Sequence, residues 1–108
     1  MTRNELLEEI LANINGGGIT AMQIVEITAA YTALTSDDII LGKGTFDVDL
    51  PPSNSGVKSV SIKSVLGGGT VTVIPDGSEL IEGQATHILT VGAAVTIAPT
   101  TTGDWVII

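Results

Sequence analysis

Most of this chain consists of short runs in which apolar and polar residues alternate, a pattern that few folds accommodate. In TFDVDL (45–50), phenylalanine, valine and leucine alternate with threonine and aspartate, and TVTV (70–73) and AAVTIA (93–98) behave alike. Because successive side chains of a strand point to opposite faces of a sheet, a period of two indicates strands. Turn-forming clusters such as LPPSNSG (50–56), GGG (67–69) and PDGS (75–78) separate the runs.

These runs predict a β-rich fold for most of the chain. Many short strands at this spacing are typical of an all-β domain, here a small antiparallel β-sandwich or roll. A length of 108 residues suggests a single domain, and 44% hydrophobic against 15% charged residues argues against disorder. We expect strands near residues 23–29, 38–42, 45–50, 58–65, 70–75, 79–82, 86–91, 93–98 and 104–108.

The first residues have a different period. TRNELLEEILANIN (2–15) predicts a short amphipathic α-helix, with Thr2 and Glu5 as a capping box. Gly16–Gly18 ends the helix and acts as a joint, so we divide the chain into a segment 1–18 and a β domain 19–108. A helix of about fourteen residues is marginal alone in water, so its apolar stripe needs a partner. The stripe consists of Leu6, Leu7, Ile10, Leu11 and Ile14.

Three partners remain open for this helix. The helix could fold back on its own domain, form a short bundle with sister chains, or dock on a different protein. The glycine joint favours the last two, and we expect the stripe to make an anchoring or a trimer contact.

Several predicted strands are apolar on both faces, and the last strand of the chain is one of them. IVEI (24–27), DDIILG (37–42) and WVII (105–108) contain more Val and Ile than one small core hides. A symmetric oligomer buries such a surplus, and we expect a homotrimer. In the last strand Trp105 and Ile107 share one face and Val106 and Ile108 the other. One face belongs to the core and the other to a subunit contact; the sequence does not say which.

Charge and composition exclude several classes of partner. The net charge of -8 argues against nucleic acid and against an anionic membrane surface. No apolar run approaches the roughly 18 residues of a membrane-spanning helix, and the acidic, amphipathic start does not resemble a signal peptide. The chain has no cysteine, and only three per cent of its residues are aromatic. Aromatic side chains dominate many recognition surfaces, so their scarcity favours packing and self-association.

No motif of enzyme chemistry is complete, and we expect neither catalysis nor a cofactor. GKGT (42–45) lacks the spacing of a phosphate-binding loop and reads as a turn between strands. His87 is the single histidine, too few for a zinc site, and no G-x-S-x-G elbow accompanies it. Asp47, Asp49 and the Asp76–Glu79 turn carry oxygen ligands but form no EF-hand loop, so we expect no metal.

The order of three segments resembles a known family. These are YTALTSDDIILGKGTFDVDLPPS, KSVSIKSVLGGGTVTVIPDGSELIEG and THILTVGAAVTIAPTTTGDWVII. Together they are similar to the trimeric β modules of bacteriophage tail fibres, head fibres and related virion appendages. The likeness extends from about Ile24 to Ile108. The closing Thr102–Trp105 segment departs from the family's usual Asp-Gly-Thr-Asn-Trp.

The resemblance implies a structural, trimeric part of a virion, made in the cytoplasm of a bacterial host. Met1 leads directly into the capped helix, so we expect a free-standing capsid decoration, cement or head-fibre protein. Residues 1–18 would anchor it on the major capsid protein or another virion protein. The alternative is the receptor-binding tip of a tail fibre, with its recognition surface near Ser53–Val57 and Leu66–Thr70. A small glycan-active enzyme is a third possibility, with no motif in its favour.

Overall fold

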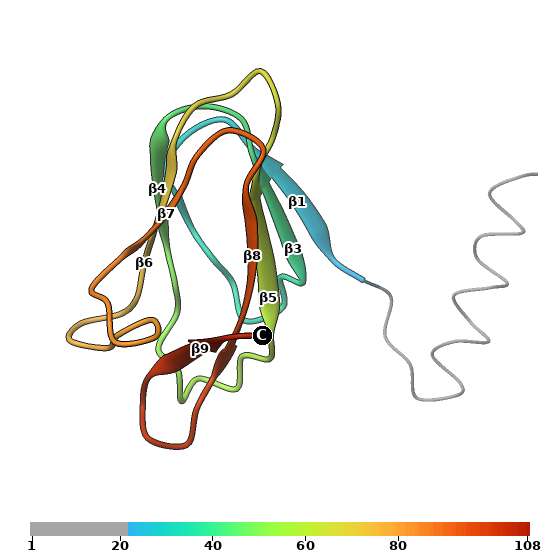
Figure 1. Ribbon diagram of the computed structural model, residues 1–108. Helices are drawn as coiled ribbons and strands as arrows, with labels where there is room; N and C mark the ends of the chain where they lie inside the picture. The colour runs from blue at the N-terminus through green and yellow to red at the C-terminus, as the bar shows by residue number, and fades with distance from the viewer. Residues whose placement is uncertain (1–21) are drawn as a thin grey trace, which may run out of the picture.

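A computed structural model describes residues 22–108 (Figure 1). Within this range every regular element is a β-strand, and the strands form two sheets, so the prediction of an all-β fold is confirmed. The helix predicted over Thr2–Asn15, its apolar stripe of Leu6, Leu7, Ile10, Leu11 and Ile14, and the boundary between residues 18 and 19 lie outside the described residues.

One sheet has five strands and the other has four, and the two face each other as layers (Figure 1). The five-stranded sheet contains, in spatial order, β1 (Ile24–Ile27), β3 (Ile39–Gly42), β5 (Val60–Ser64), β8 (Ala94–Pro99) and β9 (Trp105–Ile107). The four-stranded sheet contains, in spatial order, β2 (Tyr31–Thr32), β4 (Phe46–Asp49), β6 (Val71–Ile74) and β7 (His87–Leu89).

The first six strands alternate between the two sheets. The chain runs along β1, crosses to the other layer for β2, and returns for β3, so it builds successive arches. Each strand therefore pairs with the next but one, and β1–β3, β3–β5, β2–β4 and β4–β6 are all parallel. The prediction of an antiparallel sandwich is wrong for this part. The connection that parallel neighbours need is supplied here by a strand of the opposite sheet.

The last three strands return to antiparallel pairing. β7 pairs with β6, β8 with β5, and β9 with β8. The strand expected at 79–82 is absent from the structure. In its place Ile81 makes isolated bridges to Gln84 and Trp105, because the chain turns sharply there and Glu82 takes a positive φ of 48°. The remaining expected strands lie within about two residues of observed ones, and β2 is additional.

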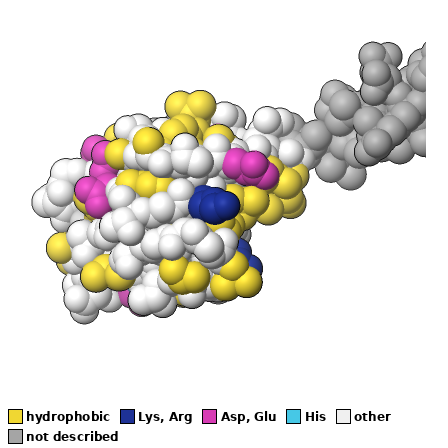
Figure 2. Space-filling model, turned by 90° about the horizontal axis from the view of Figure 1, so that it is seen from above, with side chains coloured by type: hydrophobic (Ala, Val, Ile, Leu, Met, Phe, Trp, Pro, Cys, Tyr) yellow, Lys and Arg dark blue, Asp and Glu magenta, His cyan; other side chains and the backbone are white. Residues whose placement is uncertain are grey.

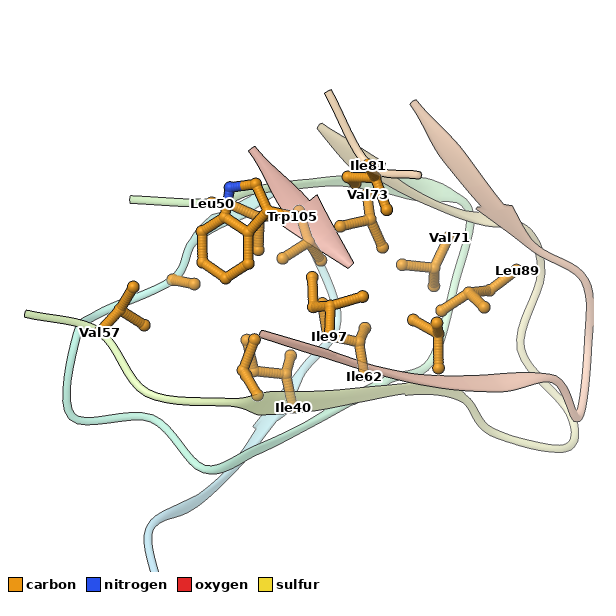
Figure 3. Packing of buried hydrophobic residues seen from close by; sticks show 14 of the residues in the cluster. Ile40, Leu50, Val57, Ile62, Val71, Val73, Ile81, Leu89, Ile97 and Trp105 are labelled. Atoms are coloured by element: carbon orange, nitrogen blue, oxygen red, sulfur yellow. The ribbon is translucent and has the colours of Figure 1, made fainter. Parts of the chain in front are cut away.

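The space between the sheets is filled by one hydrophobic cluster (Figure 3). Ile40, Ile62 and Ile97 of the five-stranded sheet have no accessible surface, and neither have Val71 and Val73 opposite them. Burying each such side chain contributes about 1.5–3 kcal/mol. The alternation in TFDVDL is confirmed, because valine and leucine are buried there whereas both aspartates are exposed.

The glycines at 67–69 join β5 to β6, and close packing leaves no room for a Cβ atom at Gly68 or Gly69. A Cβ atom at Gly69 would overlap Thr45 Oγ1 and lie 3.1 Å from the carbonyl carbon of Gly44. The carbonyl of Gly69 also accepts a 2.6 Å hydrogen bond from the hydroxyl of Ser64, which is fully buried. These glycines therefore allow the connection between β5 and β6 to pack closely against the connection between β3 and β4.

Gly69→Ala is expected to destabilise the fold by about 1–3 kcal/mol, because an added methyl group overpacks this contact. Denaturant unfolding of the variant and the parent measures the difference. In a Thr45→Ala background the same substitution should cost less, since the colliding hydroxyl is gone. An equal cost in both backgrounds would show that the collision with Thr45 is not the cause.

Candidate functional site

The outward faces of the two sheets differ in character. On the four-stranded sheet, one row runs Asp47–Thr72–Ile88 and the next includes Thr32 and Asp49. Both aspartates and Thr32 are exposed, and Ile88 is the large apolar side chain that stands out, at 61% exposure. Asp47 and Asp49 thus lie on the solvent face of their strand, and this layer is suited to contact with water.

The outward face of the five-stranded sheet, here called the outer face, has apolar side chains at its two margins and polar side chains on the strands between them. The strand register aligns Ile24, Ile39, Ser61 and Thr96 in one cross-strand row. Ile108 extends this row, because its N–H donates a 2.8 Å hydrogen bond to the carbonyl of Thr96. Ile24 is 58% exposed and Ile108 is 70% exposed. The two ends of this row therefore expose large apolar side chains, with Ser61 and Thr96 between them.

The last strand contributes to both sides of this sheet. Trp105 points inward and is 1% exposed, and Ile107 shares its side, paired with the buried Ile97 but 40% exposed. Val106 pairs with Ala98 on the outer face, where it is half-buried beside the exposed Ile108. The tryptophan side of the strand therefore belongs to the core, and the side of Val106 and Ile108 is directed outward.

Charge on the outer face does not follow the acidic character of the chain. The next row of this face runs Glu26–Leu41–Lys63–Ala94, and Lys43 directly follows the end of β3. Seen from above, lysine side chains lie among hydrophobic ones toward the right of the molecule, with acidic side chains beside them and others at the left edge (Figure 2). This face therefore carries both signs of charge, although the whole chain has a net charge of -8.

A polar cleft of about 460 Å³ lies between the loop after β4 and the loop before β9. Its walls carry the hydroxyl groups of Ser53, Thr100, Thr101 and Thr102. The carboxylate of Glu79 lines it as well, and Asn54 and Gly103 complete the lining. Such a concave surface with several hydroxyl groups offers hydrogen bonds to a polar ligand.

The carboxylate of Glu79 is already engaged by the protein. It accepts hydrogen bonds from the backbone N–H of Ser53 at 3.1 and 3.2 Å and from the Ser53 hydroxyl at 2.7 Å. The indole Nε1–H of Trp105 donates to Glu79 Oε1 at 3.2 Å. Glu79 therefore fastens the loop after β4 to the last strand. The lone pairs of this carboxylate are largely occupied by these hydrogen bonds, so we assign Glu79 a structural role.

A second carboxylate holds the turn between β2 and β3. Asp37 is 7% exposed, and its Oδ2 accepts a 2.6 Å hydrogen bond from the Tyr31 hydroxyl and a 2.9 Å bond from the N–H of Leu34. The bond to Asp37, together with burial and the negative charge of Asp37, raises the pKa of Tyr31 from 10.0 to about 12. The pair stabilises the crossing from the four-stranded to the five-stranded sheet.

This raised pKa predicts a loss of stability in alkali. The folded state holds the phenolic proton more tightly than the unfolded state, so the contribution is complete below pH 10 and decreases as the pH rises toward 12. In Tyr31→Phe we expect lower stability at neutral pH and a weaker decline across that interval. Unfolding midpoints at several pH values measure both. Parallel declines in parent and variant would contradict this role for Tyr31.

The other residues that the sequence suggested for a catalytic, phosphate or metal site do not lie together in one place. Gly42–Thr45 form the crossing from β3 to β4, and His87 pairs with Val73 on the edge strand of the smaller sheet. The backbone N–H of Glu79 donates to the carbonyl of Asp76 at 3.0 Å, as in a tight turn. Between residues 22 and 108 no group of three His, Cys, Asp or Glu side chains is placed to hold a metal ion.

The sequence singled out the final strand but not the residues that accompany it. Ile24, Ile39 and Leu41 join Val106 and Ile108 on the outer face, at the two margins of one sheet. The signal was present, because the runs IVEI, DDIILG and WVII are apolar on both faces. All three runs belong to the five-stranded sheet. Only the topology shows that they share a surface.

No protein-family profile, no curated protein and no solved structure matches this chain. Within residues 22–108, no helix has the length and apolar character needed to span a membrane.

Proposed function

We propose that this chain is a structural protein of a bacteriophage virion that decorates or reinforces the capsid as a homotrimer, either as a cement protein or as a head fibre. Residues 1–18 anchor the trimer on the major capsid protein or another virion protein, and the β domain projects from the shell. No enzymatic activity, cofactor, nucleic acid or membrane enters this proposal.

The observation that carries the proposal is the pair of exposed apolar margins on the outer face of the five-stranded sheet. A lone domain would leave Ile24 and Ile108 in water at the two ends of one row. The ordered likeness of residues 24–108 to trimeric virion modules adds a reason to choose a virion part. Multivalent attachment through three anchors also suits a closed shell with repeated sites.

A second candidate is the receptor-binding tip of a tail fibre, and the polar cleft favours it. The cleft contains Ser53 from one of the two loops expected to form a recognition surface. The other expected loop, Leu66–Thr70, lies at the opposite end of the sandwich (Figure 1). The two loops therefore do not form one surface, and a receptor site would be confined to the hydroxyl-lined end.

Immunogold labelling of purified phage particles with an antibody to residues 22–108 separates these functions. We expect many labels distributed over the capsid shell. Labels restricted to the tail extremity would replace the proposal with the receptor-binding tip. Particles that contain the major capsid protein but no trace of this chain would contradict both.

A further inference from the structure

A small pocket of about 220 Å³ opens where β1, β3 and β5 end. These three strands run parallel, so their carboxyl ends lie side by side. The N–H of Lys43 donates to the carbonyl of Ile27, and that of Val65 to the carbonyl of Gly42, both at 3.0 Å. A recess with a mainly apolar wall is suited to an apolar side chain. The lining consists of Glu26, Ile27, Thr28, Leu41, Lys43 and Val65.

An apolar margin of the outer face leads to this pocket. The margin consists of Ile24, Ile39 and Leu41, and Leu41 lines the pocket as well. Ile24 is 58% exposed, and Ile39 and Leu41 are half-buried. From Ile24 to Ile27 the strand covers only about 10 Å. The margin and the pocket therefore form one apolar strip along the edge strand β1, here called the edge strip.

Residues 1–18 match the edge strip in chemistry and in reach. The chain before Met22 joins the sheet through β1, which is the strand that carries the strip. The helix predicted over Thr2–Asn15 has an apolar stripe and is marginal alone in water. A helix of this length extends about 21 Å, which is enough to cover the strip from Ile24 to the pocket. The stripe thus has a partner of matching character within its own chain.

The connection between the helix and the strand favours one direction for the helix. Residues 16–23 span at most about 29 Å when fully extended. A helix antiparallel to β1 needs only a small part of that length, whereas a parallel helix needs most of it, because the chain must return along the whole helix. The antiparallel course brings the first turns, with Arg3, Glu5 and Glu8, to the pocket. Arg3 lies on the face of the stripe, because it precedes Leu7 by four residues.

The charges on the two sides are complementary. At the pocket end Lys43 and Lys63 are exposed, and Glu26 is the carboxylate beside them. The glutamates of the first helical turns outnumber Arg3, as the lysines outnumber Glu26. Glutamates can therefore face the lysines while Arg3 faces Glu26. Complementary charges of this kind fix the register of a contact more than they add affinity.

We propose that residues 2–15 fold back as a helix onto the edge strip of their own domain and place apolar side chains of the stripe in the pocket. Of the three partners open to the helix, the pocket, the course of the chain and the charges select this one. The short joint holds the stripe at an effective concentration of about a millimolar, so weak contacts suffice. This goes beyond the proposed function and needs neither a trimer nor a virion. The free chain covers its stripe, which leaves the strip when it binds another protein.

A single spin label on the full-length chain tests the contact, because the chain has no cysteine of its own. Ala12→Cys lies on the side of the predicted helix away from the stripe, so the label alters neither the stripe nor a charge. In the amide NMR spectrum, Leu41 and Lys63 should lose most of their intensity. Thr72 and Ile88, on the outward face of the other sheet, should keep theirs. Equal loss on both sheets, or no loss at Leu41 and Lys63, would overturn the proposal.

A mixed sample shows whether the contact lies within one chain. Spin-labelled chains without the NMR isotope are unfolded and refolded together with isotope-labelled chains that carry no spin label. The loss at Leu41 should disappear in this mixture. A loss that persists would assign the stripe to a neighbouring chain and overturn the proposal.

A matched pair of charge reversals tests the course of the helix. Lys43→Glu in the spin-labelled chain should restore much of the intensity at Leu41, because it repels the glutamates of the first turns. Lys58→Glu makes the same change of charge at an exposed lysine outside the pocket lining and should leave the loss unchanged. The same response to both substitutions would contradict the proposed course of the helix over the pocket.

Discussion

Trp105→Ala is expected to bring the domain close to unfolding, with a loss of about 3–5 kcal/mol. The indole is 1% exposed and lies at the end of the core where Leu50 also lies (Figure 3). Its removal leaves a large cavity and also deprives Glu79 of a hydrogen bond from Nε1. Small domains are stable by only about 5–15 kcal/mol, so the loss is a large part of the total. Denaturant unfolding followed by circular dichroism measures it.

Trp105→Phe is the matched control for this experiment. Phenylalanine restores most of the volume but cannot donate to Glu79, so we expect it to lose much less stability than alanine. Both variants should be compared with the parent at one protein concentration, because association shifts apparent stability. Coincident midpoints for Trp105→Ala and the parent would contradict the burial of this side chain.

Deleting residues 1–18 is expected to abolish binding to virus particles while leaving the β domain assembled. The predicted stripe contributes five apolar side chains per chain, and each buried one is worth about 1.5–3 kcal/mol. In the proposed trimer, three anchors would multiply weak single contacts into firm attachment, so we expect a loss of several orders of magnitude. Co-sedimentation with particles that lack the native protein measures it, and gel filtration reports assembly.

The control for the deletion keeps the segment and removes only its stripe. Leu7→Ser/Leu11→Ser should also release the protein from particles if the apolar side chains make the contact. Undiminished sedimentation of the truncated protein would assign docking to the β domain. A truncated protein that elutes as monomers would make residues 1–18 a trimerisation stalk, and the fibre-tip function would then be favoured.

The sequence was sufficient to predict most of the strands but not their pairing. Alternation within TFDVDL reports which side chains are buried, and the structure confirms it. It contains no information on which strand lies alongside, so the parallel pairing of β1 with β3 was missed. β2 was missed as well, because Tyr31–Thr32 is too short for a periodic pattern. Its position depends on pairing with β4 and on the Tyr31–Asp37 hydrogen bond.

The candidate surface was only partly predictable for the same reason. The doubly apolar runs indicated surplus hydrophobic surface, and they suggested that the last strand faces two environments. Neither composition nor spacing shows that Ile24 and Ile108 end the same row, because more than eighty residues of chain separate them and three strands of the sheet lie between β1 and β9. The polar cleft was also hidden, since Ser53 and Glu79 meet only through the fold.

The mass of the intact chain in solution is the most direct test of an assembling structural protein. Static light scattering at micromolar concentration should give three times the chain mass of 11.0 kDa, unchanged on moderate dilution. A stable, monodisperse species of a single chain mass would contradict the account.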